Sequence, residues 1–83
     1  MATITGVTIF QHGTEIARAP SGEIAPPPDH QLTITGATWT GPRRNLDYLQ
    51  QKVDIEATAA GQRWKSTLRI TGIKGHTTIH LDP

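Results

Sequence analysis

A four-residue phrase, Ile-Thr-Gly followed by an apolar residue, occurs at residues 4–7, 34–37 and 70–73 and constrains the fold more than any other feature. In the first two copies, apolar residues occupy even positions before the glycine and odd positions after it. Successive side chains of a strand point to opposite faces, so this change of parity requires either an inserted residue or a switch of the buried face. A β-bulge inserts the residue, because glycine adopts positive φ without steric cost. The repeat therefore predicts bent strands of a small closed or nearly closed β-structure, with the bends at Gly6, Gly36 and Gly72.

The clearest strand pattern lies between residues 53 and 70. Apolar residues at 53, 55, 57 and 59 alternate with polar ones up to Ala60-Gly61, and beyond this pair the inward set becomes Trp64, Ser66, Leu68 and Ile70. One hairpin register matches apolar partners on one face and polar or oppositely charged partners on the other. It pairs Val53 with Leu68, Asp54 with Thr67, Glu56 with Lys65 and Ala57 with Trp64.

A second hairpin is predicted at the start of the chain, where a strand over residues 2–11 meets a turn at His12-Gly13. Histidine tolerates and glycine favours the left-handed conformation that two-residue hairpin turns need. Pairing Gln11 with Thr14 places Phe10 opposite Glu15 and Ile9 opposite Ile16. This register keeps one apolar face.

Two connections interrupt the strand pattern. Residues 19–31 form a predicted crossover loop, because Pro20, Ser21, Gly22 and the triple proline 26–28 break the alternation. The triple proline favours an extended polyproline conformation, either as a stiff crossover between sheets, which we prefer, or as a docking arm. Residues 41–52 are either an irregular loop or a short helix with Asn45 as its N-cap and Leu46, Leu49 and Val53 on one face.

The remaining segments complete six strands. Residues 32–40 form the second bent strand and end in Trp39, and a turn at Lys74-Gly75 leads into a last strand over residues 76–81. The prediction is a single all-β domain over residues 1–83, a six-stranded antiparallel sandwich or partly open barrel with glycine bulges.

Composition limits what such a domain does alone. The 83 residues include no cysteine, only 35 % are hydrophobic, and the formal net charge is +1. A core this small gives a few kcal/mol at most, which favours burial against another copy or a partner. No signal peptide or membrane-length apolar run is evident, so we expect a soluble protein that is cytoplasmic or part of a particle assembled there.

Catalytic and metal-binding patterns are weak. Ser21 lies in the proline-rich loop and Ser66 is expected to point inward, so neither has the setting of a nucleophile. Asp54 and Glu56 face basic residues across the hairpin and form a solvated ion-pair ladder rather than an acid and base. His76 and His80, four residues apart on one strand, stand about 13 Å from each other and cannot share an ion. We expect no enzyme activity, no metal and no cofactor.

Two functions stay open. The preferred one is a structural or protein-interaction module that associates with itself or docks within a larger assembly, most specifically a small structural or accessory protein of a virus or phage. Its contacts would come from exposed loops, at Pro26, Pro27, Pro28, Arg43, Arg44 and Tyr48. The alternative is a small barrel that binds single-stranded nucleic acid through basic loops, stacking aromatics and one basic strand face, with Arg63, Lys65 and Arg69 as contacts. A membrane partner is not expected.

Overall fold

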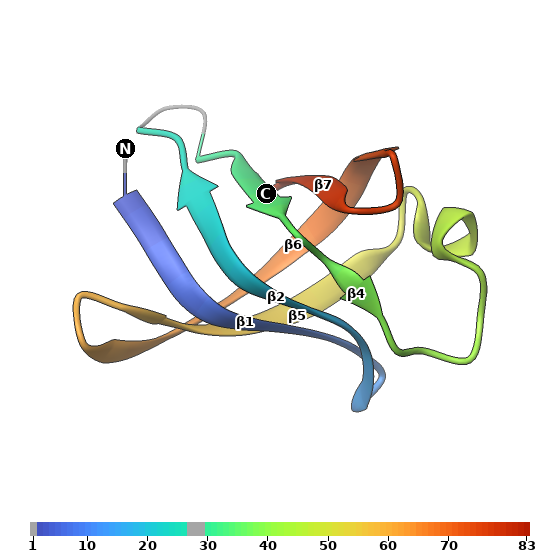
Figure 1. Ribbon diagram of the computed structural model, residues 1–83, viewed down its shortest axis with the longest axis horizontal. Coiled ribbons are helices and arrows are strands. Elements are labelled where there is room, and N and C mark those ends of the chain that lie inside the picture. The colour runs from blue at the N-terminus through green and yellow to red at the C-terminus, as the bar shows by residue number, and fades with distance from the viewer. Residues whose placement is uncertain (1, 27–29) are drawn as a thin grey trace.

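The protein folds as a closed antiparallel β-barrel (Figure 1). The computed structural model describes residues 2–26 and 30–83. Its elements are β1 (Ala2–Gln11), β2 (Thr14–Ile24), β3 (Leu32–Thr35), β4 (Thr38–Trp39), the 3₁₀ helix η1 (Asn45–Tyr48), β5 (Lys52–Ala59), β6 (Gln62–Lys74) and β7 (Thr78–Asp82). The order is β1-β5-β6-β7-β3-β2, and β1 also pairs with β2, which closes the barrel. The all-β, six-stranded prediction is confirmed, and β4 is an additional short strand on β2.

The glycine repeat marks three irregularities, as predicted. Gly6 and Gly36 have φ values of +58° and +71°. At Gly6 the register between β1 and β5 shifts, and at Gly36 the predicted strand 32–40 divides into β3 and β4. The third copy also carries a register shift, between Ile70 and Gly72, in the pairing with β7. Gly72 is not in the left-handed region, however, so the expectation that glycine is needed there for positive φ is wrong.

The hairpin of β5 and β6 has the predicted register. Val53 pairs with Leu68, Asp54 with Thr67, Glu56 with Lys65 and Ala57 with Trp64. The two turn residues, Ala60 and Gly61, both have positive φ, which matches the right-handed twist of the flanking strands. The hairpin extends at one end of the molecule, opposite η1 (Figure 1).

The hairpin of β1 and β2 has the predicted turn but a different register further along. Phe10 lies opposite Glu15 as expected, yet Ile9 pairs with Ala17 rather than with Ile16. A bulge inserts Ile16 as an extra residue, which allows Ile16 and Ala17 to be buried in succession. Simple alternation cannot anticipate this insertion.

The predicted crossover 19–31 begins too early, because β2 continues to Ile24. Pro20 falls opposite Gly6, between the pairs Thr5–Ser21 and Val7–Ala19, at the point where the pairing of β1 with β5 is irregular, and the missing proline N–H is tolerated. The connection therefore starts after Ile24. Pro26 is exposed in it, whereas Pro27 and Pro28 lie outside the described residues.

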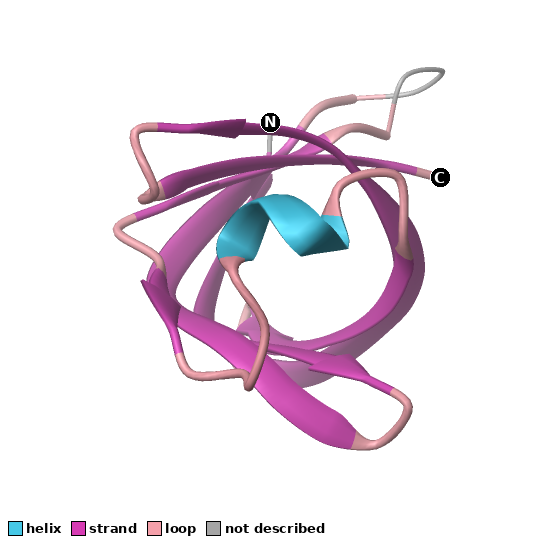
Figure 2. Cartoon of the chain, turned by 90° about the vertical axis from the view of Figure 1, so that its right-hand side faces the viewer, coloured by secondary structure: helices cyan, strands magenta, loops and turns pink. Residues whose placement is uncertain are grey.

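The connection before β5 contains the short-helix alternative, as η1, but with a different buried face. Arg44, not Asn45, is the N-cap residue, and it makes no capping hydrogen bond through its side chain. Leu46 is 59 % exposed and Tyr48 is 1 % exposed. The helix ends at Tyr48, so Leu46, Leu49 and Val53 do not share one continuous helical face, and the i, i+3, i+7 pattern of an α-helix selects the wrong side chain. Figure 2 shows η1 lying across the mouth of the barrel.

The last strand begins later than predicted. Residues 75–77 form the turn, β7 starts at Thr78, and His76 has a φ of +64°. His76 therefore belongs to the turn and does not share a strand face with His80.

The core fills the barrel with small and branched side chains from every long strand. Its buried members are Ile4, Val7, Ile9, Ile16, Ala17, Ala19, Leu32, Ile34, Ala37, Tyr48, Val53, Ile55, Ala57, Leu68, Ile70, Ile79 and Leu81. Trp64 and Ser66 have the predicted inward parity, but both are only half-buried. The described residues thus leave the barrel incompletely covered beside the first half of β6.

Candidate interaction edge

Strand β6 extends further than one of its two neighbours. On one side, β5 pairs with it from Gln62 to Arg69. On the other side, β7 pairs only from Arg69 to Lys74 and ends at Asp82, opposite Arg69. Residues 63–67 of β6 therefore have no strand partner on that side within residues 2–26 and 30–83. We call this stretch the open edge.

The hydrogen bonds of Ile70 show which backbone groups face the open edge. Gln50 N donates to Ile70 O at 2.7 Å, and Ile70 N donates to Gln51 O at 3.1 Å, so the polar groups of Ile70 point toward the β5 side. Successive residues of an antiparallel strand alternate between their two neighbours. The N–H and C=O groups of Arg63, Lys65 and Thr67 consequently point away from β5 and toward the open side.

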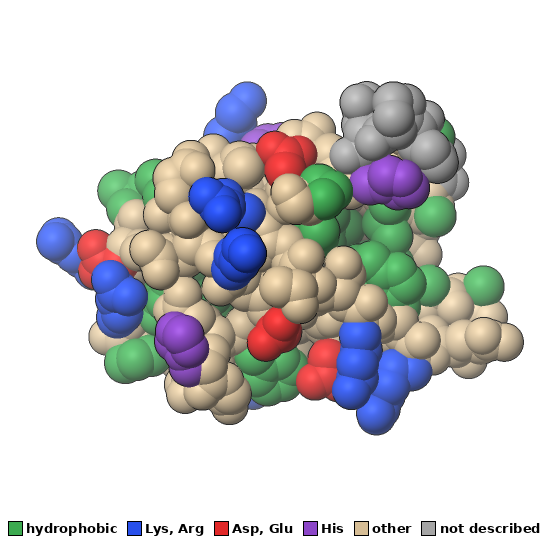
Figure 3. All heavy atoms as spheres, turned by 180° about the vertical axis from the view of Figure 1, so that it is seen from behind, with side chains coloured by type: hydrophobic (Ala, Val, Ile, Leu, Met, Phe, Trp, Pro, Cys, Tyr) green, Lys and Arg blue, Asp and Glu red, His purple; other side chains and the backbone are tan. Residues whose placement is uncertain are grey.

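An apolar groove of about 380 Å³ lies beside the open edge. Its apolar lining comes from β2, β3, β6 and the residue after β7: Ile24, Leu32, Trp64, Leu68 and Pro83. Lys65, Ser66 and Thr67 line the groove along the edge itself. In Figure 3 green apolar side chains gather on this side of the molecule, with charged side chains below them. The site therefore joins unpaired backbone groups to an apolar hollow.

The outer face of β6 is basic. Arg63, Lys65 and Arg69 are exposed and alternate with the inward residues. Acidic neighbours come from β5, where Lys65 Nζ lies 3.9 Å from Glu56 Oε1 and Thr67 Oγ1 donates to Asp54 Oδ1 at 2.8 Å. A further one comes from β7, where Asp82 lies opposite Arg69. The acidic residues of β5 neutralise the basic row on the β5 side of the strand.

The predicted contact residues Arg43, Arg44 and Tyr48 do not form one exposed surface. Arg43 and Arg44 are exposed, but Tyr48 is buried, so its ring is not available to a partner and that expectation is corrected. The ring of Tyr48 stacks on Trp39 with centroids 5.8 Å apart and planes 4° apart, and the Arg43 guanidinium lies 5.5 Å from its centroid. Tyr48 is therefore part of the packing that covers this end of the barrel.

Hydrogen bonds fix the same end. Trp39 Nε1 donates to His76 O at 2.7 Å, and Asn45 Nδ2 lies 2.6 Å from His76 Nδ1. Arg43 N donates to Tyr48 Oη at 3.3 Å. This network ties η1 and the residues before it to the turn between β6 and β7.

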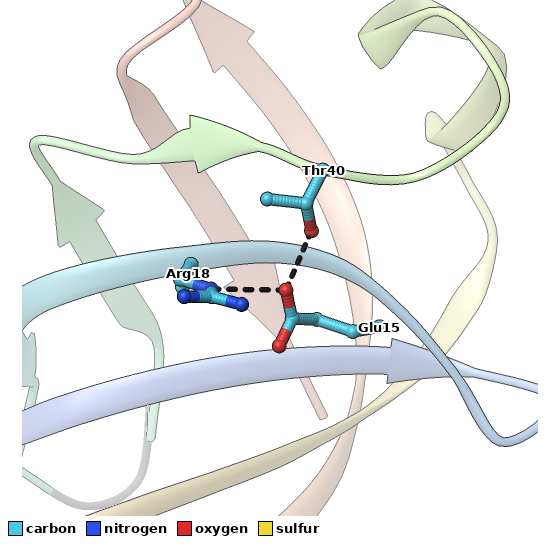
Figure 4. Close-up of polar contacts among 3 residues, drawn as sticks. All are labelled: Glu15, Arg18 and Thr40. Carbon is cyan, nitrogen blue, oxygen red and sulfur yellow. Dashed lines mark hydrogen bonds and ion pairs between the residues drawn. The ribbon is translucent and has the colours of Figure 1, made fainter.

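The network continues along β2 through Glu15 (Figure 4). Thr40 Oγ1 donates to Glu15 Oε2 at 2.8 Å, and Arg18 Nε donates to the same oxygen at 2.9 Å. The bond from Thr40, followed by those from Arg18, lowers the pKa of the Glu15 carboxyl below its usual value. A carboxylate held ionised in this way is a structural tie rather than a general acid.

The residues expected to contact nucleic acid are brought together only in part. Arg63, Lys65 and Arg69 share the outer face of β6, as predicted. Two of the aromatic side chains, Trp39 and Tyr48, stack on each other beside η1. The structure therefore separates the basic strand from these aromatic rings.

The described ranges contain no candidate metal cluster and no helix of membrane-spanning length. Residues 2–26 and 30–83 contain no cluster of three or more His, Asp or Glu side chains with metal-binding geometry. His80 Nδ1 lies 3.3 Å from Thr33 Oγ1 and His76 Nδ1 contacts Asn45, so each imidazole has a polar neighbour. In the same ranges, no helix is long and apolar enough to cross a membrane.

Sequence reasoning missed the open edge and the groove, although part of the signal was present. The predicted strands already showed that the partner after the 74–75 turn is shorter than the strand before it, which leaves an overhang. Ile24 and Pro83 could not be assigned to the groove, because their proximity to Trp64 depends on barrel closure. Comparisons of the chain with protein-family models, with curated protein sequences and with solved structures find no match.

Proposed function

We propose that this chain is a non-enzymatic protein-interaction module that binds an extended segment of another protein along the open edge of β6. The observation that carries the proposal is that the N–H and C=O groups of Arg63, Lys65 and Thr67 have no strand partner on this side among residues 2–26 and 30–83, and that they lie beside an apolar groove. In strand addition, backbone hydrogen bonds supply affinity and pockets for alternate side chains supply specificity. Both elements are present at this edge.

The surroundings of the edge support this function. Proteins usually cover, shorten or protect strand edges, because an unpaired edge is a template for pairing with another chain. Here the edge carries the charges of Arg63 and Lys65 but is not covered by another strand in the described part of the chain. It lies beside Trp64, an aromatic side chain of the type that is enriched where proteins bind one another. We propose a small structural or accessory subunit that docks in a larger assembly, such as a viral particle, through this edge.

The test is a display library of random extended peptides, selected on the purified protein. Thr67→Pro removes an edge N–H that β5 does not use, and the proline ring obstructs pairing. Thr67→Ala is the matched control, because it loses the same side-chain bond to Asp54 but keeps the N–H. We expect selected peptides to bind wild type and Thr67→Ala and to lose binding to Thr67→Pro, with circular dichroism confirming that each variant is folded. A selection without binders, or with binders indifferent to Thr67→Pro, would contradict the proposal.

A second candidate function, binding of single-stranded nucleic acid, is favoured by one observation. Lys52 lies opposite Arg69, so these two basic residues adjoin on the outer surface and continue the row formed by Arg63 and Lys65. We rank it second because Glu56 and Asp54 lie beside the row. Fluorescence anisotropy of a labelled oligothymidylate measures this affinity. An affinity that falls steeply with salt and is lost in the double variant Arg63→Ala, Arg69→Ala supports phosphate contacts. Binding that does not depend on salt contradicts them.

A further inference from the structure

We infer that the segment bound at the open edge alternates acidic and apolar residues. The inference rests on the proposed function, because it specifies the chemistry of a strand added to β6. Three observations carry it: the basic residues on the outer face of β6, the apolar groove on its inner face, and the sequence of β5, the strand that already pairs with β6 on its other side.

The outer side requires negative charge. Arg63 and Lys65 project from the outer face of the open edge. Arg69, the next basic residue of the row, already lies opposite Asp82 of β7. Side chains directly opposite one another on neighbouring strands interact, favourably when their charges are opposite and unfavourably when they are alike. An added strand therefore fits when its outward residues are Asp or Glu.

The inner side requires apolar residues. Trp64 and Leu68 point inward between the basic residues and line the groove with Ile24 and Leu32. Neighbouring strands share a pleat, so the residues of an added strand that alternate with its acidic ones point into this groove. Burial of apolar side chains there supplies the non-electrostatic part of the affinity.

Strand β5 already shows this pattern on the paired side of β6. Its residues 53–57 read Val-Asp-Ile-Glu-Ala, with the apolar members buried. Glu56 approaches Lys65 and Asp54 accepts the hydroxyl of Thr67. An added segment with the same alternation gives the first half of β6 equivalent neighbours on both sides.

The same charges oppose a second copy of this chain at the edge. Antiparallel pairing of two open edges centred on Lys65 places two Lys65 side chains opposite each other. Shifting the register so that Lys65 meets Thr67 brings Arg63 to position 69, which Asp82 of β7 already occupies, and shifting it the other way brings Arg63 opposite Lys65. Like charges directly opposite destabilise a strand pair. The occupant is therefore a different chain with acidic residues.

The probe is an acetylated and amidated eight-residue peptide that alternates Val or Ile with Asp or Glu. Its matched controls are a peptide with Lys in place of each acid and a scrambled peptide of the same composition without the alternation. Binding is followed by NMR through shift changes and slowed hydrogen exchange of the Arg63, Lys65 and Thr67 amides. We expect the alternating acidic peptide to protect these amides and both control peptides to leave them unchanged.

Protein variants separate charge from backbone pairing. Lys65→Glu is expected to lower the affinity for the acidic peptide by roughly tenfold, because an attractive cross-strand pair becomes a repulsive one. The same variant is expected to bind the lysine peptide. Thr67→Pro abolishes binding of either peptide, whereas Thr67→Ala retains it. A variant that was merely destabilised would not gain binding to the lysine peptide, so this gain by Lys65→Glu separates charge from loss of folding.

Each contrary outcome identifies which statement fails. If library peptides bind in a Thr67→Pro-sensitive manner but are neutral or basic, the acidic chemistry is overturned and the proposed function stands. If no peptide binds at all, both fall. If the scrambled peptide binds equally well, the basic surface binds acidic chains regardless of their pattern, and strand addition is overturned. A dimer in light scattering that Thr67→Pro dissolves would show that a second copy is the occupant and overturn the inference.

Discussion

The two tryptophans of this chain have the same inward parity and opposite surroundings. Trp39 is half-buried, and both its ring and its N–H have partners within the chain: the ring stacks on Tyr48 and the N–H donates to His76 O. Trp64 is also half-buried, but it borders the groove next to the open edge of β6. Parity therefore tells which face of a strand a side chain occupies, and the connections decide whether that face is covered. One end of the barrel is closed by its own chain, and the flank at Trp64 is left partly exposed by the described residues.

The largest expected difference concerns the removal of an aromatic ring from each region. Tyr48→Ala leaves a cavity in the covered end and is expected to lower the free energy of unfolding by about 3–5 kcal/mol. Trp64→Ala removes a ring that already borders solvent, so its loss is expected to be smaller. Urea unfolding followed by circular dichroism measures both. Equal losses would show that the two regions are packed alike.

A smaller effect is expected at Gly41, where the covered end leaves no room for a side chain. A Cβ added there would lie 2.6 Å from Tyr48 Oη and 3.0 Å from Ile16. Gly41→Ala is therefore expected to destabilise the protein by about 1–3 kcal/mol through overpacking. In the Tyr48→Phe background the hydroxyl is absent, so the same substitution should cost less. An unchanged penalty in a double-mutant cycle would contradict the proposed contact.

The indole N–H groups give a closer comparison. Trp39→Phe removes the hydrogen bond to His76 O along with part of the ring, and the loss of that bond is expected to contribute about 1 kcal/mol. The matched change, Trp64→Phe, is expected to have a smaller effect on unfolding and to act mainly on peptide binding at the groove. Thermal unfolding of the two variants, paired with the NMR titration, distinguishes these outcomes. The comparison fails if Trp64→Phe is the more destabilising change.

Local patterns predicted the elements of this fold better than they predicted its closure. The register of β5 and β6 followed from matching side chains on both faces, because the turn and the alternation reinforce each other. The Ile-Thr-Gly phrases located irregularities in three strands. In contrast, the bulge at Ile16 and the continuation of β2 past Pro20 depend on how β2 pairs with the facing strand β1. These are properties of pairs of segments and are absent from either segment alone.

The candidate site was harder to predict because exposure is decided by tertiary contacts. Tyr48 lies in a polar connection and was expected to be exposed, but η1 turns it onto the barrel mouth. The basic residues of β6 were predicted on one face, and this is observed. That residues 63–67 lie at an open edge depends on where β7 ends, opposite Arg69, and the sequence of β6 alone does not show this.

The smallest expected effect is a dependence on acid that belongs to the Trp39 end. Hydrogen bonds from Thr40 and then Arg18 lower the folded-state pKa of Glu15, so the carboxylate stabilises the fold above its unfolded pKa, and this contribution disappears as the pH falls through the lower folded value. Glu15→Gln should remove that part of the pH dependence, while Glu56→Gln, on the exposed hairpin, serves as the matched control. Hydrogen exchange resolved by residue measures where the change occurs. Acid should loosen the amides of residues 38–41, which the Glu15–Thr40 bond ties to β2, before it affects residues 63–67. Simultaneous loosening of both segments would mean that the two regions open as one cooperative unit, and that the covered end is not a separate closure.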